Sequence, residues 1–199
     1  MFFVIFMTSL WLVPRLRNTL LTDNILAIPS KHKLRLNVNK CIFFKPVLSF
    51  LGYEVSPVGV RPPPDKVAVI SEFPLPGTSK ELRQFMGMLN FFQQMILRFA
   101  EIAHLVTELL RHNHSTNSLH WSDSARASFD CLKQALLDCP TLVYPSTSST
   151  QYQLVTDSSG LAVGAALYQM VDAKPSPIVF FSKKLCNVQK TYSTYDREL

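Results

Sequence analysis

Two carboxylates near the carboxyl terminus, Asp157 and Glu198, follow residue patterns that could place them for chemistry. A strand-like run over 151–156 delivers Asp157 at its end, and Glu198 lies in a helix that begins near Tyr192. Acidic side chains that a strand and a helix carry to one point can act as metal ligands or as acid and base groups. Spacing alone favours a plainer interpretation, in which Asp157 ends a strand and Glu198 lies on a helix surface.

The elements that must position these carboxylates are predicted from residue periodicity. Three strands are expected, at about 151–156, 162–170 and 177–182, and the chain ends within the helix that follows them. The run Ser146–Thr150 is the clearest linker in the sequence, because it contains only serine and threonine. A domain boundary is therefore predicted between Pro140 and Gln151.

The middle of the chain is predicted to be helical. A short helix is expected from about Asp65 to Glu72, and Thr78–Glu81 has capping-box spacing. Apolar residues then recur at steps of three and four, which predicts a helical hairpin that runs to about Leu110, with the stripe as core. A further helix begins at Ser122 and ends before Pro140.

The segment before these helices favours β structure. Aromatic and β-branched residues predict two short strands, at 42–44 and 48–55, joined at 45–47, and Ser56–Gly59 has the residues of a turn. The fold class expected for the whole chain is α+β, in which a β-hairpin and a helical region precede an α/β domain.

Composition narrows the class of partner. The 199 residues are 47% hydrophobic, which excludes a disordered tail, and the formal net charge of +6 favours a polyanion. No acidic residue occurs between Asp23 and Glu54, whereas this window contains Lys31, Lys33, Arg35, Lys40 and Lys45. A cationic surface that contacts phosphate is one interpretation, and an ordinary solvated lysine face is the other.

Several other classes of site and location are disfavoured. The four cysteines show no Cys-x-x-Cys spacing, which suits reduced thiols in the cytoplasm or nucleus. His112, His114 and His120 crowd a polar loop without a recognisable metal spacing. The apolar run Met1–Val13 is shorter than the ~20 residues of a spanning helix, so no membrane partner is expected.

The order of several motifs carries a family resemblance. In chain order these are Lys40-Cys41-Ile42-Phe43, Phe50-Leu51-Gly52-Tyr53, Ser56–Val60, Lys80–Phe92, His120–Phe129, Thr156-Asp157-Ser158-Ser159 with Gly164-Ala165, Ile178–Leu185 and Tyr192–Leu199. Over about residues 31–199 the chain resembles the Pol polyprotein of gypsy-like LTR retrotransposons, from the end of the reverse transcriptase palm through the thumb and connection into the first half of the RNase H domain.

The resemblance implies RNA-directed DNA synthesis and hydrolysis of the RNA strand of an RNA–DNA hybrid, with two divalent ions, Mg²⁺ or Mn²⁺, held about 4 Å apart. Asp157 would be the ligand shared by both metals, and Glu198 the next catalytic carboxylate. The family's remaining carboxylates would follow Leu199, so stable metal binding is not expected. For nucleic acid, the resemblance points to a primer-grip hairpin at Phe50, Leu51, Gly52 and Tyr53, and to Lys40, Arg83 and Gln84.

The start of the chain departs from the family. The polymerase motif Tyr-x-Asp-Asp is absent upstream of Lys31, yet in a shifted reading frame Val4–Thr8 can encode Cys-Tyr-Ile-(His or Tyr)-Asp. Residues 1–30 are therefore hypothesised to be a degenerate or frameshifted palm remnant. The predicted organisation continues with the end of the palm at 31–77, a helical thumb and connection at 78–140, a linker at 141–150, and half of an RNase H-like domain at 151–199.

Three functional hypotheses follow. The leading one is a fragment of a reverse transcriptase and RNase H polyprotein that is catalytically inactive by itself, because polymerase aspartates and half of the RNase H carboxylates are absent. The second is a retained nucleic-acid-binding module, and the third is a membrane protein anchored by its apolar amino terminus. The sequence leaves the oligomeric state open. It also predicts that residues 151–199 are marginally stable alone, because a three-stranded sheet leaves an edge and one apolar face uncovered.

Overall fold

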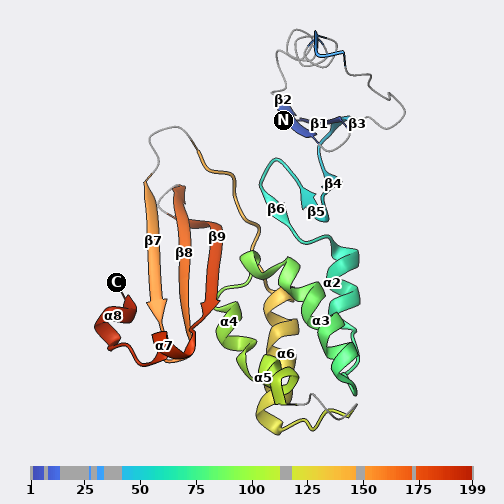
Figure 1. The fold of residues 1–199 in the computed structure, drawn as a ribbon. Coiled ribbons are helices and arrows are strands. Elements are labelled where there is room, and N and C mark those ends of the chain that lie inside the picture. Colours follow the sequence, from blue (N-terminus) through green and yellow to red (C-terminus); the bar gives the residue numbers. More distant parts are fainter. Residues whose placement is uncertain are drawn as a thin grey trace. The chain divides into compact units, whose positions relative to one another are not determined.

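The computed structural model describes residues 2–6, 9–13, 27, 31–33, 42–112, 118–146, 151–171 and 174–198. The chain divides into two compact units, Met1–Pro63 and Pro64–Leu199, and each is described by itself. Both contain antiparallel sheet, and α2 to α8 belong to the second unit, so the fold is α+β as predicted. Figure 1 follows this order of elements from β1 to α8. No helix in the described part is long and apolar enough to cross a membrane.

The first unit contains two small antiparallel sheets. One has the order β2-β1-β3, and the other has the order β4-β5-β6. Their strands are β1 (Phe2–Phe6), β2 (Ser9–Val13), β3 (Ile42–Lys45), β4 (Leu48–Phe50), β5 (Tyr53–Val55) and β6 (Val60–Arg61). The apolar amino terminus thus forms strands, which fits its aromatic and β-branched composition.

One strand prediction in this unit was wrong, and the hairpin that the resemblance implied at 50–53 is present. The strand expected at 48–55 is a hairpin, because Leu51 and Gly52 have φ of 48° and 82° and reverse the chain between β4 and β5. The strand near 42–44 does not pair with it; β3 pairs with β1 instead. The turn at Ser56–Gly59 is confirmed by backbone hydrogen bonds in both directions, of 2.9 and 3.2 Å.

The second unit begins with a helical layer. Its elements are α2 (Pro64–Ser71), α3 (Ser79–Phe91), the 3₁₀ turn η2 (Gln93–Met95), α4 (Phe99–Ile102), α5 (His104–His112) and α6 (Asp123–Leu137). The capping box is confirmed, since Thr78 accepts from the Glu81 amide and the Glu81 carboxylate accepts from the Thr78 amide. The predicted hairpin exists as separate helices, because Arg98 takes a left-handed conformation with φ 56° just before α4.

The helical layer has a buried apolar core. The predicted apolar stripe of α3 is buried, and it packs against α6, where the rings of Phe85 and Phe129 lie 4.5 Å apart between centroids. Trp121 packs edge-on against Phe129 and donates a hydrogen bond of 2.7 Å to the carbonyl of Pro76. Side chains from loops and helices therefore complete one apolar cluster, which α2, α3, α5 and α6 share.

The second unit ends in a three-stranded meander and two short helices. The sheet order is β7-β8-β9, with β7 at Tyr152–Ser158, β8 at Ala162–Val171 and β9 at Lys174–Lys184, and the helices are α7 (Asn187–Lys190) and α8 (Thr194–Glu198). All three predicted strands are present and are longer than expected. Figure 1 shows α7 and α8 following the sheet at one end.

Register separates the two faces of this sheet. Asp157 is opposite Gly164, which is opposite Ser182, so these three residues share one face, the packed face, which contacts the helical layer. Thr156, Ala165 and Phe181 share the other face, the open face. Phe180 on the packed face is 4% exposed, whereas Phe181 on the open face is 54% exposed. One face is therefore part of the core, and in the described residues the other is not.

Candidate functional site

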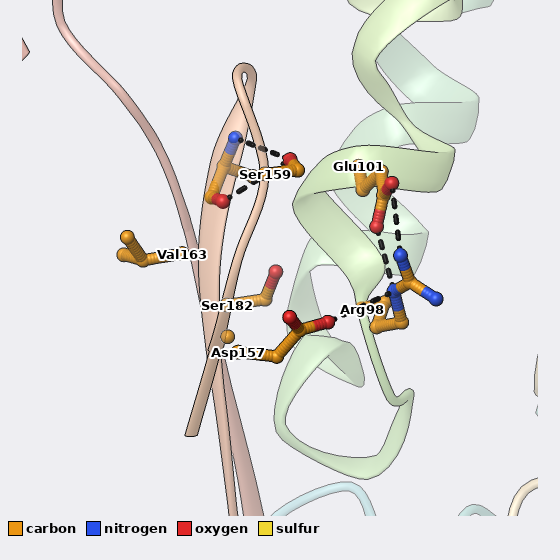
Figure 2. Close-up of a pocket in the computed structure, with 8 residues that line it drawn as sticks. Arg98, Glu101, Asp157, Ser159, Val163 and Ser182 are labelled. Atoms are coloured by element: carbon orange, nitrogen blue, oxygen red, sulfur yellow. Dashed lines mark hydrogen bonds and ion pairs between the residues drawn. The ribbon is translucent and has the colours of Figure 1, made fainter. Parts of the chain in front are cut away.

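Asp157 lies near the end of β7 on the packed face, as the sequence predicted for a strand-end carboxylate. Its side chain is 64% exposed, and its Oδ2 lies 3.9 Å from Nε of Arg98. Figure 2 shows the carboxylate pointing from the sheet toward this arginine, at the amino-terminal end of α4. Asp157 therefore lies within ion-pair distance of a cation that another element supplies.

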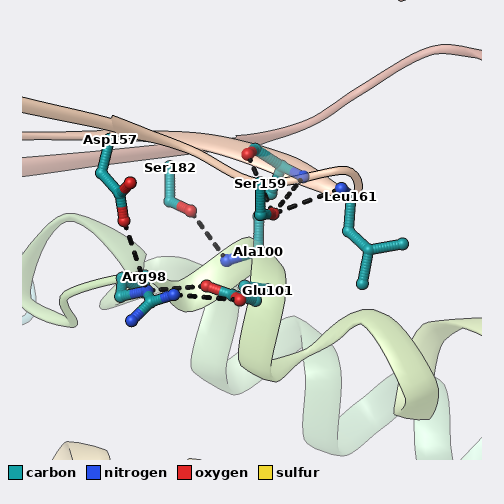
Figure 3. A network of polar contacts seen from close by, with 8 residues as sticks. Arg98, Ala100, Glu101, Asp157, Ser159, Leu161 and Ser182 are labelled. Carbon is teal, nitrogen blue, oxygen red and sulfur yellow. Dashed lines mark hydrogen bonds and ion pairs between the residues drawn. The ribbon is translucent and has the colours of Figure 1, made fainter. Parts of the chain in front are cut away.

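Arg98 is held in place by its own neighbours. Its Nε and Nη2 donate to the two carboxylate oxygens of Glu101, at 2.7 and 3.1 Å. This hydrogen bonding raises the pKa of Arg98 above its ordinary value, so the guanidinium stays charged. Two residues later, the amide of Ala100 donates a hydrogen bond of 2.9 Å to Oγ of Ser182 on β9. The start of α4 is thus joined to the packed face at two points (Figure 3).

The loop after Asp157 is fixed by Ser159. Its hydroxyl accepts from the amides of Leu161 and Ala162, at 3.2 and 3.1 Å, which closes the turn between β7 and β8. The Ser159 carbonyl accepts a hydrogen bond of 3.1 Å from Nη1 of Arg197 on α8. The helix that carries Glu198 is therefore linked to the loop beside Asp157.

Glu198 is the last residue of α8, and its side chain lies outside the described residues. Arg197 lines a cavity of about 250 Å³, mostly on the open face, with Thr156, Asp157, Ser158, Val163, Gly164, Ala165 and Phe181. A much smaller crevice, of about 10 Å³, lies between Asp157 and α4. The crevice has room for about one water molecule.

The described residues do not fit a pair of divalent metal ions. Such a site needs several oxygen ligands that converge on one point. Within the described part of the chain, no three His, Cys, Asp or Glu side chains form a group that could hold a metal. The carboxylate closest to Asp157 in the crevice is Glu101, which is bound to Arg98. Of the three histidines singled out above, His120 is exposed, and the side chains of His112 and His114 lie outside the described residues.

The predicted primer-grip residues form the tip of the β4–β5 hairpin in the first unit. Phe50 and Tyr53 pair across it, and burial raises the pKa of the Tyr53 phenol. Leu51 is 64% exposed although its φ is positive, so an apolar side chain projects from a strained backbone position. Lys40 lies outside the described residues.

The predicted residues Arg83 and Gln84 are both exposed on α3. Lys80, Gly87 and Phe91 are exposed at helical spacing on the same side, and these five residues form the α3 exposed face. The sequence interpretation missed Gly87, where an added Cβ would meet nothing within 4 Å. A glycine in the middle of a helical stripe was the signal that could have revealed it.

Comparison with known proteins identifies relatives of this chain. Residues 121–199 match the family described as the RNase H-like domain found in reverse transcriptase. The retrovirus-related Pol polyprotein from transposon opus of Drosophila melanogaster is 32% identical over 183 residues, which cover 88% of this chain and 18% of the relative. The corresponding polyprotein from transposon gypsy of the same organism is 29% identical over 185 residues, which cover 89% of this chain and 18% of the relative.

Solved structures show the same fold. The foamy viral protease-reverse transcriptase dRH in complex with double-stranded DNA has a TM-score of 0.77 and 17% identity, covering 96% of this chain and 33% of that chain. The foamy viral protease-reverse transcriptase in complex with an RNA/DNA hybrid also has a TM-score of 0.77, with 16% identity, and the match covers 25% of that chain. This chain spans less than a fifth of the length of the two transposon polyproteins.

Proposed function

Since the chain is a homologue of the Pol polyproteins of gypsy-like LTR retrotransposons, with an RNase H-like domain of the kind found in reverse transcriptase, we propose that it binds nucleic acid through the α3 exposed face. The expected ligand is an RNA–DNA hybrid or double-stranded DNA. The observation that carries the proposal is Gly87.

Gly87 has no structural explanation within the described part of the chain. Glycine in a helix interior lowers stability by about 1 kcal/mol relative to alanine. A Cβ at this position would contact nothing within 4 Å, so packing does not require glycine there. A bare backbone on an exposed helix allows a sugar–phosphate strand to approach closely, which is a use for glycine that lies outside the chain.

The neighbours of Gly87 suit such a ligand. Lys80 and Arg83 can contact phosphates, Gln84 can donate to a groove edge, and Phe91 offers an exposed aromatic surface. Phosphate contacts would supply most of the affinity, and they would make it fall as salt rises. An ordinary solvated helix face has the same charges, but it gives no reason for the glycine.

The hairpin tip in the first unit is a second contact candidate. Leu51 is apolar, exposed and held at a positive φ, a combination that contributes nothing to the core of its unit. We propose that it packs against a nucleic-acid strand, as the resemblance to a primer grip implies. Lys40 remains a predicted phosphate contact from sequence.

A binding titration tests the α3 exposed face directly. Fluorescence anisotropy with a labelled RNA–DNA hybrid is measured across a salt series for the unmodified chain, Arg83→Ala and Gly87→Gln. Arg83→Ala is expected to weaken binding and to reduce the salt slope by about 1. Gly87→Gln is expected to weaken binding at every salt concentration, because its side chain blocks close approach.

Matched controls come from α6. Arg126 and Ala127 are exposed there, so Arg126→Ala removes one charge and Ala127→Gln adds one side chain without changing the α3 exposed face. Both are expected to bind as the unmodified chain does. If the α6 variants lose as much affinity as the α3 variants, binding is general electrostatics and the proposed interface is wrong.

We also propose that this chain alone does not hydrolyse the RNA strand of a hybrid. Asp157 faces Arg98, and the described residues do not supply the converging carboxylates that two metals require. Incubation of a labelled hybrid with Mg²⁺ or Mn²⁺, beside an Asp157→Asn control, tests this. Cleavage that disappears in Asp157→Asn would contradict the proposal.

A cytoplasmic or nuclear location, predicted from the cysteines, is testable by imaging a fluorescent fusion.

A further inference from the structure

The packed face of the sheet presents a row of polar groups to the helical layer. Asp157 on β7 and Ser182 on β9 are aligned across Gly164, and each contacts the segment that begins at Arg98. Arg98 contributes its side chain and Ala100 its backbone amide. Figure 3 shows both contacts from one side, with Glu101 beside the guanidinium.

We infer that Arg98 is a positioning residue that holds the Asp157 carboxylate against α4 and opposes the binding of a divalent cation at that carboxylate. The inference rests on Asp157 being the functional carboxylate, but it does not depend on the α3 exposed face. The cation beside Asp157 and the absence of converging carboxylates among the described residues both disfavour a metal at this position. The carboxylate already has a protein cation 3.9 Å away, which it shares with Glu101.

The backbone of Arg98 supports this role. A non-glycine residue at φ 56° is unfavourable by about 1 kcal/mol, and such a conformation persists only where contacts determine it. The bidentate pair with Glu101 fixes the guanidinium plane. The hydrogen bond from Ala100 to Ser182 fixes the backbone immediately after it. Arg98 is therefore held by contacts that do not involve Asp157, with its Nε–H donated to Glu101 and the same nitrogen 3.9 Å from Asp157 Oδ2.

The magnitude of the effect follows from exposure. The Arg98 side chain is 52% exposed and that of Asp157 is 64% exposed, so solvent screens their attraction. Removal of the arginine charge should therefore change the affinity of Asp157 for a cation by about two- to five-fold. A direct binding measurement can resolve such a change, whereas the stability of the whole unit cannot.

The test is a Mn²⁺ titration followed by electron paramagnetic resonance. Arg98→Asn is the informative variant, because asparagine tolerates positive φ and the charge is removed without backbone strain. We expect Arg98→Asn to bind Mn²⁺ more tightly than the unmodified chain by about two- to five-fold. The double variant with Asp157→Asn should lose that gain, and Arg126→Asn on α6 should behave as the unmodified chain does.

A second readout reports the contact itself. The nuclear magnetic resonance signal of the Arg98 Nε–H group should shift in Asp157→Asn, and circular dichroism confirms that each variant is folded. The inference is overturned if Arg98→Asn binds Mn²⁺ no better than the unmodified chain, if the gain survives Asp157→Asn, or if the Nε–H signal is unchanged. Hybrid binding by Arg98→Asn is measured in parallel, so that failure of the α3 interface is seen separately.

Discussion

The helical layer and the β7–β9 sheet belong to one compact unit but differ in how they are closed. In the helical layer, the side chains of Leu82, Phe85 and Leu89 have no exposed surface. In the sheet, Leu154 is 65% exposed and Phe181 is 54% exposed. The helical layer therefore contains a complete core, whereas in the sheet the buried residues lie in β8 and β9 and β7 is exposed over 152–157. Stability in this unit is expected to come from the helices, with the sheet attached to them.

Limited proteolysis should show the largest difference in stability between the helical layer and the β7–β9 sheet. The predicted linker lies before Gln151, so the first cut is expected between Pro145 and Gln151, after which the sheet should be degraded faster than the helical layer. Mass spectrometry of a time course identifies the fragments. A protease-resistant fragment containing β7–β9 would show that the sheet is stable without the helical layer.

Two phenylalanine-to-alanine variants, one in each region, compare how much the helical layer and the sheet contribute to the free energy of unfolding. Phe129→Ala in the helical core should lower the free energy of unfolding by about 3–5 kcal/mol. Phe181→Ala on the open face should lower it by less than about 1 kcal/mol, because half of that ring is already in water. Urea denaturation monitored by circular dichroism gives both values. Equal losses would mean that the open face is covered in solution.

The ion pair between Glu108 and Lys184 predicts acid sensitivity where the two regions meet. The hydrogen bond from Lys184 lowers the pKa of the Glu108 carboxyl from 4.5 to about 2. Because the folded-state pKa is lowered, this stabilisation is complete above pH 4.5 and is lost as pH falls toward 2. After allowance for solvent screening, we expect a loss of about 1 kcal/mol.

Urea denaturation at several pH values, with Glu108→Gln as control, measures this loss. The variant should lack the component between pH 4.5 and 2. His104 contributes in a different range: burial lowers its pKa from 6.5, so its contribution begins to fall as pH drops below 6.5. An unchanged pH profile in Glu108→Gln would show that the pair with Lys184 does not link the two regions.

The smallest expected effects on stability come from removing two hydroxyls, one that caps α3 and one that closes the β7–β8 turn. Thr78→Ala removes the cap of α3 and should lower the free energy of unfolding by about 1 kcal/mol. Ser159→Ala removes the acceptor for the Leu161 and Ala162 amides, and it should speed their hydrogen exchange with little change in global stability. If Ser159→Ala destabilises the whole unit as Thr78→Ala does, the sheet contributes to global stability.

Local signals predicted most of the helical layer and the strand positions. The capping box at Thr78, the α3 stripe and the three carboxyl-terminal strands could be predicted because each depends on neighbours in sequence. The pairing of β3 with β1 could not, since its partner lies far away in the chain. The residue pattern alone predicted one strand over 48–55, because leucine rarely adopts positive φ, whereas the resemblance to a primer grip implied the hairpin at 50–53.

In the candidate site, too, features set by local sequence could be predicted, whereas contacts set by packing could not. Asp157 was predicted at a strand end because the strand pattern and the carboxylate are adjacent in sequence. Its partner Arg98 could not be predicted, since their contact depends on a left-handed residue and on the packing of α4 against the sheet. Arg83 and Gln84, which the resemblance assigned to nucleic acid, lie on an exposed helix surface. Their contact with nucleic acid remains a prediction.

The hydrogen bond that Ser182 accepts and the one that Lys184 donates give β9 a mechanical role. Both residues attach β9 directly to the helical layer, through Ala100 and Glu108, whereas the described attachment of β7 is the longer contact from Asp157 to Arg98. A pulling force applied to the sheet should therefore peel β7 away first, while β9 stays anchored. The order of rupture in a single-molecule force experiment would follow the order of the strands, from the free edge inward.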